Sequence, residues 1–419
     1  MEPLLKVQLL VMSAGERYSL LVDAATRLPV YGPNLFLTSQ IRNAGLSHAS
    51  LAACAGCLVI LHRFFRAQEL DVTLRFQQQK FLSESELDAL RDFCKISFDV
   101  RLVSFARASG KAEKPSRTNP NVSKATEYKR LSVAANYLVW LARRELDPLD
   151  DEPSGLMKMA NAILARRPLY KGRNTGLIER SLSDQEVDYL LGVVDLDSPL
   201  NPFQLTVRKR NRLIILLEYE LGIRVGEALN IRVKDFDFSC STLRIVRRAD
   251  QLDDTRVRQP LVKTKDRELP VSDWLIAEVH NYIMSERSKT FNAKKCPYLF
   301  ITVKSGQTQG RAWSIAGYYK MWSTLHAVHP TLKCVTGHRL RHTWNYRFSG
   351  SVDTGVYKLS EAEEEAARSM LMGWQQGSGT AATYNRRHIV KKANLASLEL
   401  QQTSRRETRG DDNSNPRRN

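Results

Sequence analysis

The pattern of apolar and polar positions changes several times along the chain. Residues 6–12 and 18–23 are short β-type runs on either side of the polar segment 13–16, which predicts a β-hairpin. From about Asn34 onward the apolar positions take the spacing of helices. We therefore expect a short β-type element over residues 1–33, followed by a helical region.

Residues 34–170 are predicted to form a helical, basic domain. Polar residues and two prolines predict a loop over 107–121. The clearest helix is 123–145, with an apolar stripe of Leu131, Ala134, Ala135, Leu138 and Leu141. Other helices are expected at about 47–66, 84–98 and 152–166.

A second domain follows a basic interdomain linker, predicted at residues 171–182 because it lacks an apolar period. Ser183 and Glu186 have the spacing of a capping box, which starts a helix. The expected fold class is mainly α with a small β-sheet. This domain is predicted to span residues 183–402, with strands at 243–246 and 267–271. A disordered polar tail is predicted at 403–419.

Composition and charge limit the functional classes. The 419 residues carry a formal net charge of +18 and are 42% hydrophobic, which excludes wholesale disorder and favours a polyanionic partner. The most apolar stretch, residues 51–61, is too short to span a membrane and is expected to be a core helix. Within it, Cys54 and Cys57 are interpreted as packed core thiols rather than a metal or redox pair. Six irregularly spaced cysteines and the lack of a signal peptide predict a reduced, cytoplasmic, nucleoid-associated protein without a membrane partner.

Three separated clusters in the second half carry residues suited to phosphoryl transfer. They are Arg224 with Glu227, then His338, Arg341 and His342, and finally Trp374 with Tyr384. Taken alone, the first cluster is equally consistent with an ion pair at a helix start.

In this order, behind a basic helical domain, the clusters resemble the tyrosine recombinase (phage integrase) family. The resemblance covers about residues 183–400, and more loosely 34–170, which looks like the family's core-binding domain. It implies a C-shaped clamp on DNA built from these two domains. By resemblance, Tyr384 is the nucleophile and Glu227 buttresses the site, while His342 supports the helix of His338. The other catalytic positions implied by the family are Arg224, His338, Arg341 and Trp374.

The family's catalytic lysine lies in a β-hairpin, before a strand that ends in proline. Lys263 is favoured because it starts a Lys-Thr pair at about the family's distance from Pro270. Lys265 stays an alternative because this hairpin is one residue short.

The chemistry explains these residue types independently of the family. A phenol, with a pKa near 10, needs cationic neighbours to attack phosphorus. Two guanidinium groups can bind the non-bridging oxygens, and a lysine can protonate the leaving 5′ oxygen. The product is a 3′-phosphotyrosine, so no cofactor is expected, neither ATP nor a metal. The sequence also lacks a phosphate-binding Gly-rich loop and zinc-ligand spacing.

Three segments depart from the family pattern. Trp374 and Tyr384 are ten residues apart, one more than usual, and Tyr357 is the least implausible substitute nucleophile. An insertion over 247–259 precedes the lysine hairpin. An acidic segment over 359–368 is either a solvated face or a contact to a neighbouring protomer.

The sequence therefore favours a site-specific DNA recombinase, working on double-stranded DNA as a homo-tetramer and a monomer or dimer when free. An accessory DNA-bending or directionality factor is a further expected partner. The alternatives are a type IB topoisomerase or telomere resolvase, and a non-catalytic DNA-binding protein. Residues 1–33 are either an arm-site DNA-binding element or an extended lead into the helical domain.

Basic residues on the 123–145 helix generate the first prediction. Neutralising Lys124, Lys129 and Arg130 together should weaken DNA binding and flatten its salt dependence, because fewer counterions are then released. Binding titrations over a salt series measure this slope. An unchanged slope would show that these residues do not contact phosphates.

Overall fold

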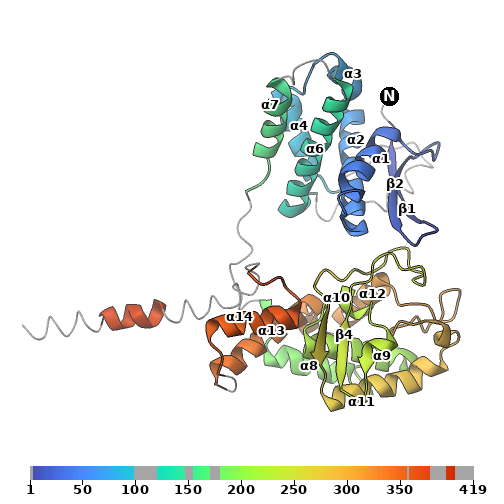
Figure 1. The fold of residues 1–419 in the computed structure, drawn as a ribbon, viewed down its shortest axis with the longest axis vertical. Coiled ribbons are helices and arrows are strands. Elements are labelled where there is room, and N and C mark those ends of the chain that lie inside the picture. The colour runs from blue at the N-terminus through green and yellow to red at the C-terminus, as the bar shows by residue number, and fades with distance from the viewer. Residues whose placement is uncertain are drawn as a thin grey trace, which may run out of the picture. The chain divides into compact units, whose positions relative to one another are not determined.

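The computed structural model divides the chain into two compact units, Met1–Arg173 (unit 1) and Asn174–Asn419 (unit 2). It describes residues 3–98, 120–146, 154–169, 180–355, 358–377 and 393–401. Both units are mostly helical, and each carries one small antiparallel sheet (Figure 1). The expected fold class, mainly α with a small β-sheet, is confirmed.

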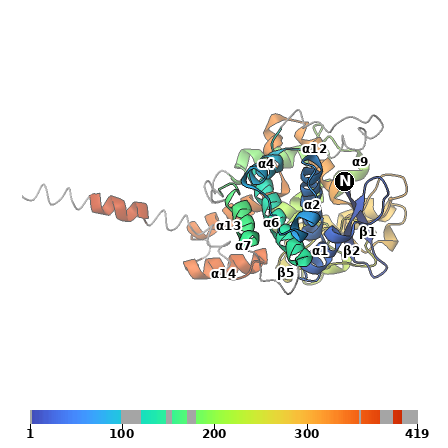
Figure 2. The same ribbon diagram turned by 90° about the horizontal axis from the view of Figure 1, so that it is seen from above.

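Unit 1 begins with the predicted hairpin. Strands β1 (Leu5–Val11) and β2 (Arg17–Asp23) pair antiparallel along their whole length, and they lie beside α1 and α2 in both views (Figures 1 and 2). Leu5, Tyr18 and Leu21 belong to the same buried core as the helices. The hairpin is therefore an integral layer of unit 1.

The helices of unit 1 follow the predicted pattern closely. They are α1 (Tyr31–Phe36), η1 (Leu37–Arg42), α2 (His48–Ala67), α3 (Val72–Gln77), α4 (Glu84–Lys95), α6 (Lys124–Glu145) and α7 (Ser154–Ala165). Ser47, Ser83 and Ser123 cap α2, α4 and α6 by accepting a backbone N–H.

Helix α2 is the core helix that the apolar pattern predicted. Among the described residues it alone is long and apolar enough to cross a membrane, and 56% of its most apolar stretch is buried inside unit 1. Cys54 is buried in this core, and burial raises the pKa of its thiol to about 12. Such a thiol is a packing residue rather than a nucleophile.

Unit 2 packs its helices around a three-stranded antiparallel sheet of order β3-β4-β5. The strands are β3 (Phe236–Asp237), β4 (Thr242–Ile245) and β5 (Arg267–Pro270), and the last two confirm the predicted strands. The longer helices are α8 (Asp184–Val194), α9 (Leu205–Leu221), α11 (Asp273–Tyr282), α12 (Ile315–His326), α13 (Gly337–Asp353) and α14 (Glu361–Met372). Short turns are α10 (Val225–Ala228), η4 (Val233–Asp235), η5 (Ile283–Arg287), η6 (Ala293–Lys295) and η7 (Pro330–Cys334). Residues 393–401 form a further helical segment whose side chains are exposed.

The insertion over residues 247–259 is anchored by a buried arginine. Arg256 pairs with Asp254 at 2.8 Å and donates to the carbonyl oxygens of Leu229 (3.0 Å) and Trp313 (3.1 Å). Tyr298 donates its hydroxyl to the same Asp254 carboxylate at 3.2 Å. The insertion is thereby fixed to the core of unit 2.

The acidic segment forms α14, and part of it is buried rather than solvated. Arg368 and Glu364 form an ion pair that is fully buried. Arg368 also donates to the carbonyl oxygen of Asn345 at 2.9 Å and to the hydroxyl of Ser349 at 2.9 Å. These contacts attach α14 to α13, and the two helices lie side by side in both views (Figures 1 and 2).

Breaking this ion pair should be costly. Glu364→Gln leaves a buried guanidinium without its counter-charge, which we expect to lower the free energy of unfolding by about 3–5 kcal/mol. The exposed Glu361→Gln serves as the control and should change it by about 0.5 kcal/mol or less. Urea unfolding of both variants gives the comparison. Equal effects would contradict the structural role assigned to Glu364.

Candidate active site

The buried carboxylate of Glu227 lies at the centre of the site. Helix α9 ends at Gly222, whose left-handed conformation (φ 61°) turns the chain sharply before Arg224. Arg224 is the N-cap of α10, and its backbone N–H donates to Glu227 Oε2 at 3.0 Å. Glu227 is 1% exposed, so this short turn places an acid inside the protein directly beneath an arginine.

Three further segments converge on this carboxylate. Arg267 of β5 donates to Glu227 Oε2 at 2.9 Å, and Thr264 of the lysine hairpin donates to Oε1 at 2.6 Å. Arg341 of α13 pairs with it at 4.0 Å. Burial by itself would raise the pKa of Glu227, but Arg267, Arg341 and Thr264 together lower it below its usual value. Glu227 is therefore a charged hub inside the site.

Arg341 is held from several sides. Its guanidinium donates to the carbonyl oxygens of Gly222 at 2.6 Å and Met372 at 3.1 Å, and lies 5.3 Å from the ring centroid of Trp374. The side chain is almost completely buried. The end of α9, helix α13 and the end of α14 thus meet at one cation.

The start of α13 packs closely on a buried acid. A side chain at Gly337 would lie 2.1 Å from the hydroxyl of Tyr318 and 2.6 Å from the carboxylate of Glu218, so only glycine fits. Tyr318 donates to Glu218 at 2.8 Å, and burial raises the pKa of Glu218 to about 8. This packing fixes the position of α13, which carries the next residue, His338.

His338 and His342 form a pair one helical turn apart. Their Nε2 atoms are 3.1 Å apart, so one ring donates to the other. Burial, then the His338 ring and nearby guanidinium groups, lower the pKa of His342 to about 4. Desolvation and the charges of Arg224 and Arg341 lower the pKa of His338. Both rings are therefore neutral at pH 7.

The lysine hairpin is docked against the end of α14. The backbone N–H of Lys265 donates to the carbonyl oxygen of Gly373 at 3.0 Å, and Arg267 donates to that of Leu371 at 2.7 Å. A side chain at Gly373 (φ 64°) would lie 2.8 Å from Thr264 Cβ. Thr264 points inward, whereas Lys263 and Lys265 are both exposed on either side of it. Both lysines thus flank a residue that bonds Glu227, and the choice between them stays open.

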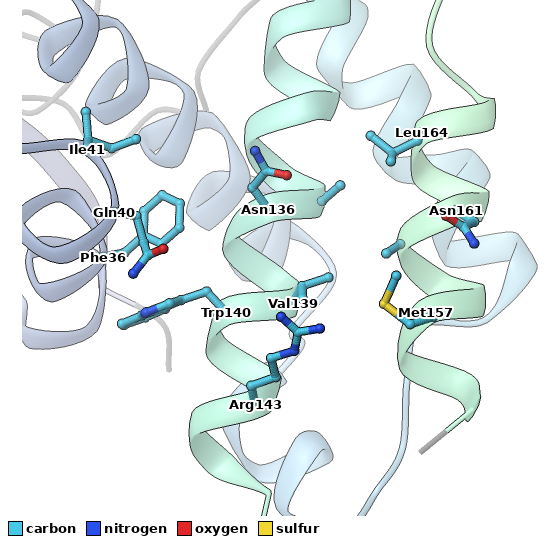
Figure 3. A pocket seen from close by; sticks show the side chains of 12 residues that line it. Phe36, Gln40, Ile41, Asn136, Val139, Trp140, Arg143, Met157, Asn161 and Leu164 are labelled. Atoms are coloured by element: carbon cyan, nitrogen blue, oxygen red, sulfur yellow. The ribbon is translucent and has the colours of Figure 1, made fainter. Parts of the chain in front are cut away.

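The described residues also form two clefts but no metal-ligand cluster. No three His, Cys, Asp or Glu side chains gather there as a metal ion would require. An open cleft of about 480 Å³ lies on unit 1 between α1, η1, α6 and α7, where Phe36, Trp140 and Met157 line it (Figure 3). A second cleft, of about 440 Å³, lies on unit 2 beside the 247–259 insertion. Neither contains a residue of the predicted site.

Comparison with known proteins gives a family match over part of the chain. Residues 177–354 match the family model of the phage integrase family. Tyrosine recombinase XerA of Pyrococcus furiosus is 28% identical over 171 residues, which cover 40% of this chain and 47% of that recombinase. Transposase A from transposon Tn554 of Staphylococcus aureus is 30% identical over 140 residues, or 32% of this chain and 35% of that transposase.

The segment that matches this family model makes up most of unit 2. The chain spans less than half the length of these curated relatives. The solved structure of XerH site-specific recombinase bound to difH substrate has a TM-score of 0.49 at 16% identity, covering 84% of this chain and 80% of that chain.

Unit 2 brings together several residues that its sequence suggested. Those placed around Glu227 and the histidine pair are Arg224, His338, Arg341, His342 and Trp374, while Lys263 and Lys265 flank Thr264, which bonds Glu227. Tyr384 and its alternative Tyr357 lie outside the described residues. Sequence reasoning missed Thr264 and Arg267. The position of Thr264 between the two candidate lysines was an available signal for that residue.

The predicted DNA-binding residues of α6 in unit 1 differ in their surroundings. Lys124 and Lys129 are exposed. Arg130 is half-buried and donates to the carbonyl oxygens of Cys94 and Ile96, both at 2.8 Å, at the end of α4. Arg130 thus stabilises a helix terminus, and a role of these three residues in DNA binding stays a prediction.

The hub makes stability depend on pH in a defined direction. Because the pKa of Glu227 is lower in the folded chain, its charge stabilises the fold above its unfolded pKa of about 4.3, and this stabilisation is lost as the pH falls further. Glu227→Gln should lower the free energy of unfolding at pH 7 by about 3–5 kcal/mol and make it less sensitive to pH below 5.

Urea unfolding between pH 3 and 7 measures this effect. The matched control is Glu220→Gln, which removes a partly exposed acid paired with Arg347 at 3.3 Å. A pH profile of the Glu227 variant that parallels the wild type would refute the charged state assigned to the hub.

Proposed function

We propose that this chain is a site-specific DNA recombinase that cleaves and rejoins strands through a phosphotyrosine intermediate. The observation that carries the proposal is the convergence of two arginines, a histidine pair and a lysine hairpin around one buried carboxylate. These groups supply what phosphodiester cleavage needs: charge neutralisation, a proton acceptor and a proton donor.

The steps follow from the residue types. The phenol oxygen of Tyr384 attacks phosphorus, and the bond to the 5′ oxygen breaks as the 3′-phosphotyrosine forms. Arg224 and Arg341 neutralise the charge that develops on the non-bridging oxygens, and the carbonyl contacts of Arg341 orient its guanidinium in advance. Rejoining is the reverse attack by a 5′ hydroxyl, so the bond energy is conserved in the protein–DNA link.

The remaining groups handle protons and positioning. His338 is neutral at pH 7 and can accept the tyrosyl proton, and its lowered pKa keeps it available as a base. Lys263, or Lys265, protonates the leaving 5′ oxygen. Trp374 lies against Arg341 and carries a donor-only N–H, so it can bind phosphate but cannot relay a proton.

Partners are proposed on the same basis. The net charge of +18 fits double-stranded DNA as the substrate, and we propose that catalysis occurs in a homo-tetramer on that DNA, with an accessory factor setting direction. The relatives named above are recombinases and a transposase, which favours integration or excision of a mobile element over topoisomerase-like relaxation.

Covalent trapping tests the chemistry and its nucleophile. Nicked duplexes from the DNA flanking the gene should yield a protein–DNA adduct on the 3′ side of the break, seen on a denaturing gel. Tyr384→Phe should abolish this adduct, whereas Tyr357→Phe should retain it, because only the former removes the proposed nucleophile. An adduct that survives in Tyr384→Phe would exclude Tyr384, and its loss in Tyr357→Phe alone would identify the other tyrosine.

A sulfur-substituted substrate distinguishes the two lysines. A 5′-bridging thiolate leaves without protonation, so it removes the need for the general acid. Lys263→Ala should slow cleavage of the ordinary phosphodiester by about 10²–10⁴-fold. The same variant should cleave the sulfur substrate at nearly the wild-type rate. If Lys265→Ala shows this pattern instead, the acid is Lys265; if neither does, the hairpin does not supply it.

A further inference from the structure

The first described residues of unit 2 are bonded directly to the active-site helix. Arg339 of α13 donates to the carbonyl oxygen of Ser181 at 2.8 Å and to that of Arg180 at 3.3 Å. The backbone N–H of Leu182 donates to the hydroxyl of Thr343 at 2.8 Å, and this contact is buried. Residues 180–182, the end of the predicted linker, are therefore attached to α13; we call them the entry segment.

The two anchoring residues alternate with the catalytic ones along α13. Arg339 directly follows His338, and Thr343 directly follows His342. Thr343 also donates its hydroxyl to the carbonyl oxygen of Arg339 at 2.9 Å, so the two anchors are joined to each other. The positive charge of Arg180 is among the causes that lower the pKa of both His338 and His342. The entry segment thus lies close to the histidine pair.

Loss of these two anchoring contacts should cost free energy. The N–H of Leu182 donates to the Thr343 hydroxyl in a buried contact, so removing that hydroxyl leaves a buried donor without this acceptor, at the cost of its desolvation. Arg339 additionally pairs with Glu186 at 3.9 Å, at the start of α8, and donates to the carbonyl oxygen of Cys334. The entry segment, α8 and the start of α13 therefore form one bonded group.

We propose that Arg339 and Thr343 are positioning residues that couple the entry segment to His338, so that the placement of this segment sets the rate of strand cleavage. The inference rests on the proposed function for its catalytic readout. A shift of about 1 Å in a catalytic group can cost about a hundredfold in rate. The entry segment is bonded to the residue next to His338, so displacing it changes the position of that ring.

Two pairs of variants test the coupling in the full-length chain. Thr343→Val removes the acceptor of Leu182 without changing charge or size, and Thr343→Ser restores the hydroxyl. Arg339→Gln removes the donors, and Arg339→Lys keeps the charge. The control is Arg347→Gln on the same helix, an exposed arginine paired with Glu220. Single-turnover cleavage of nicked duplexes and DNA affinity are measured side by side at a temperature where all variants are folded.

Thr343→Val and Arg339→Gln should each slow cleavage about tenfold or more while DNA affinity changes by less than about threefold. Thr343→Ser should recover most of the rate, and Arg347→Gln should match the wild type. The double variant should be little slower than the worse single variant, because both substitutions release the same segment. Cleavage at the wild-type rate, loss in proportion to affinity, or additive effects would each overturn the coupling.

A second readout does not depend on catalysis. The ring of His338 is titrated by NMR in the wild type, Thr343→Val and Arg347→Gln. We expect the pKa of His338 to shift in Thr343→Val and to stay unchanged in Arg347→Gln. If the wild type forms no DNA adduct, the proposed function fails, while a shifted titration would still support the coupling. An unshifted titration in Thr343→Val would overturn it.

Discussion

Unit 2 depends on one physical constraint: a carboxylate buried in its interior must stay charged. Taking Glu227 out of water is costly, and that cost is offset only where cations and hydrogen-bond donors surround it. The donors come from four places along the chain: the backbone of Arg224, the hydroxyl of Thr264, and the guanidinium groups of Arg267 and Arg341. Folding must bring all four together, and in doing so it assembles the proposed active site.

A second buried ion pair extends this organisation to the region of Trp374. Glu364 and Arg368 attach α14 to α13 through Asn345, and Asn345 donates in turn to the carbonyl oxygen of Arg341 at 2.8 Å. The end of α14, which leads to Trp374, is therefore set by contacts with α13.

How much of the structure the sequence could predict depends on how far apart along the chain the interacting residues lie. The hairpin, the capped helices and the strands beside the lysine hairpin come from local patterns, and the sequence predicted them. The candidate site residues were inferred because their types suit one reaction. Among the described ones, Arg224, Arg341 and the histidine pair lie close together, and their catalytic roles stay a prediction. Long-range polar contacts were not predictable: Arg267 bonds Glu227 across 40 residues, and Arg339 bonds Ser181 across 158. Nothing in the local pattern distinguishes these arginines from solvated ones.

Arg130 is another residue whose long-range contacts the sequence did not predict. Its place on a basic helix suggested a phosphate contact, yet its guanidinium donates to the carbonyl groups that end α4. The carbonyl groups and the dipole at a helix C-terminus also attract a cation. Charge along a sequence therefore indicates a polyanionic partner for the whole chain more securely than for any one residue.

The central claim is that the Glu227 hub places the general acid of strand cleavage. Thr264→Val removes the hydroxyl contact between the lysine hairpin and the hub while the Arg267 contact remains. The direct measurement is therefore its single-turnover cleavage rate on oxygen-linked and sulfur-linked substrates. The account predicts cleavage slowed by about tenfold or more on the oxygen substrate and nearly normal on the sulfur substrate. Equal rates for variant and wild type on both substrates would contradict it.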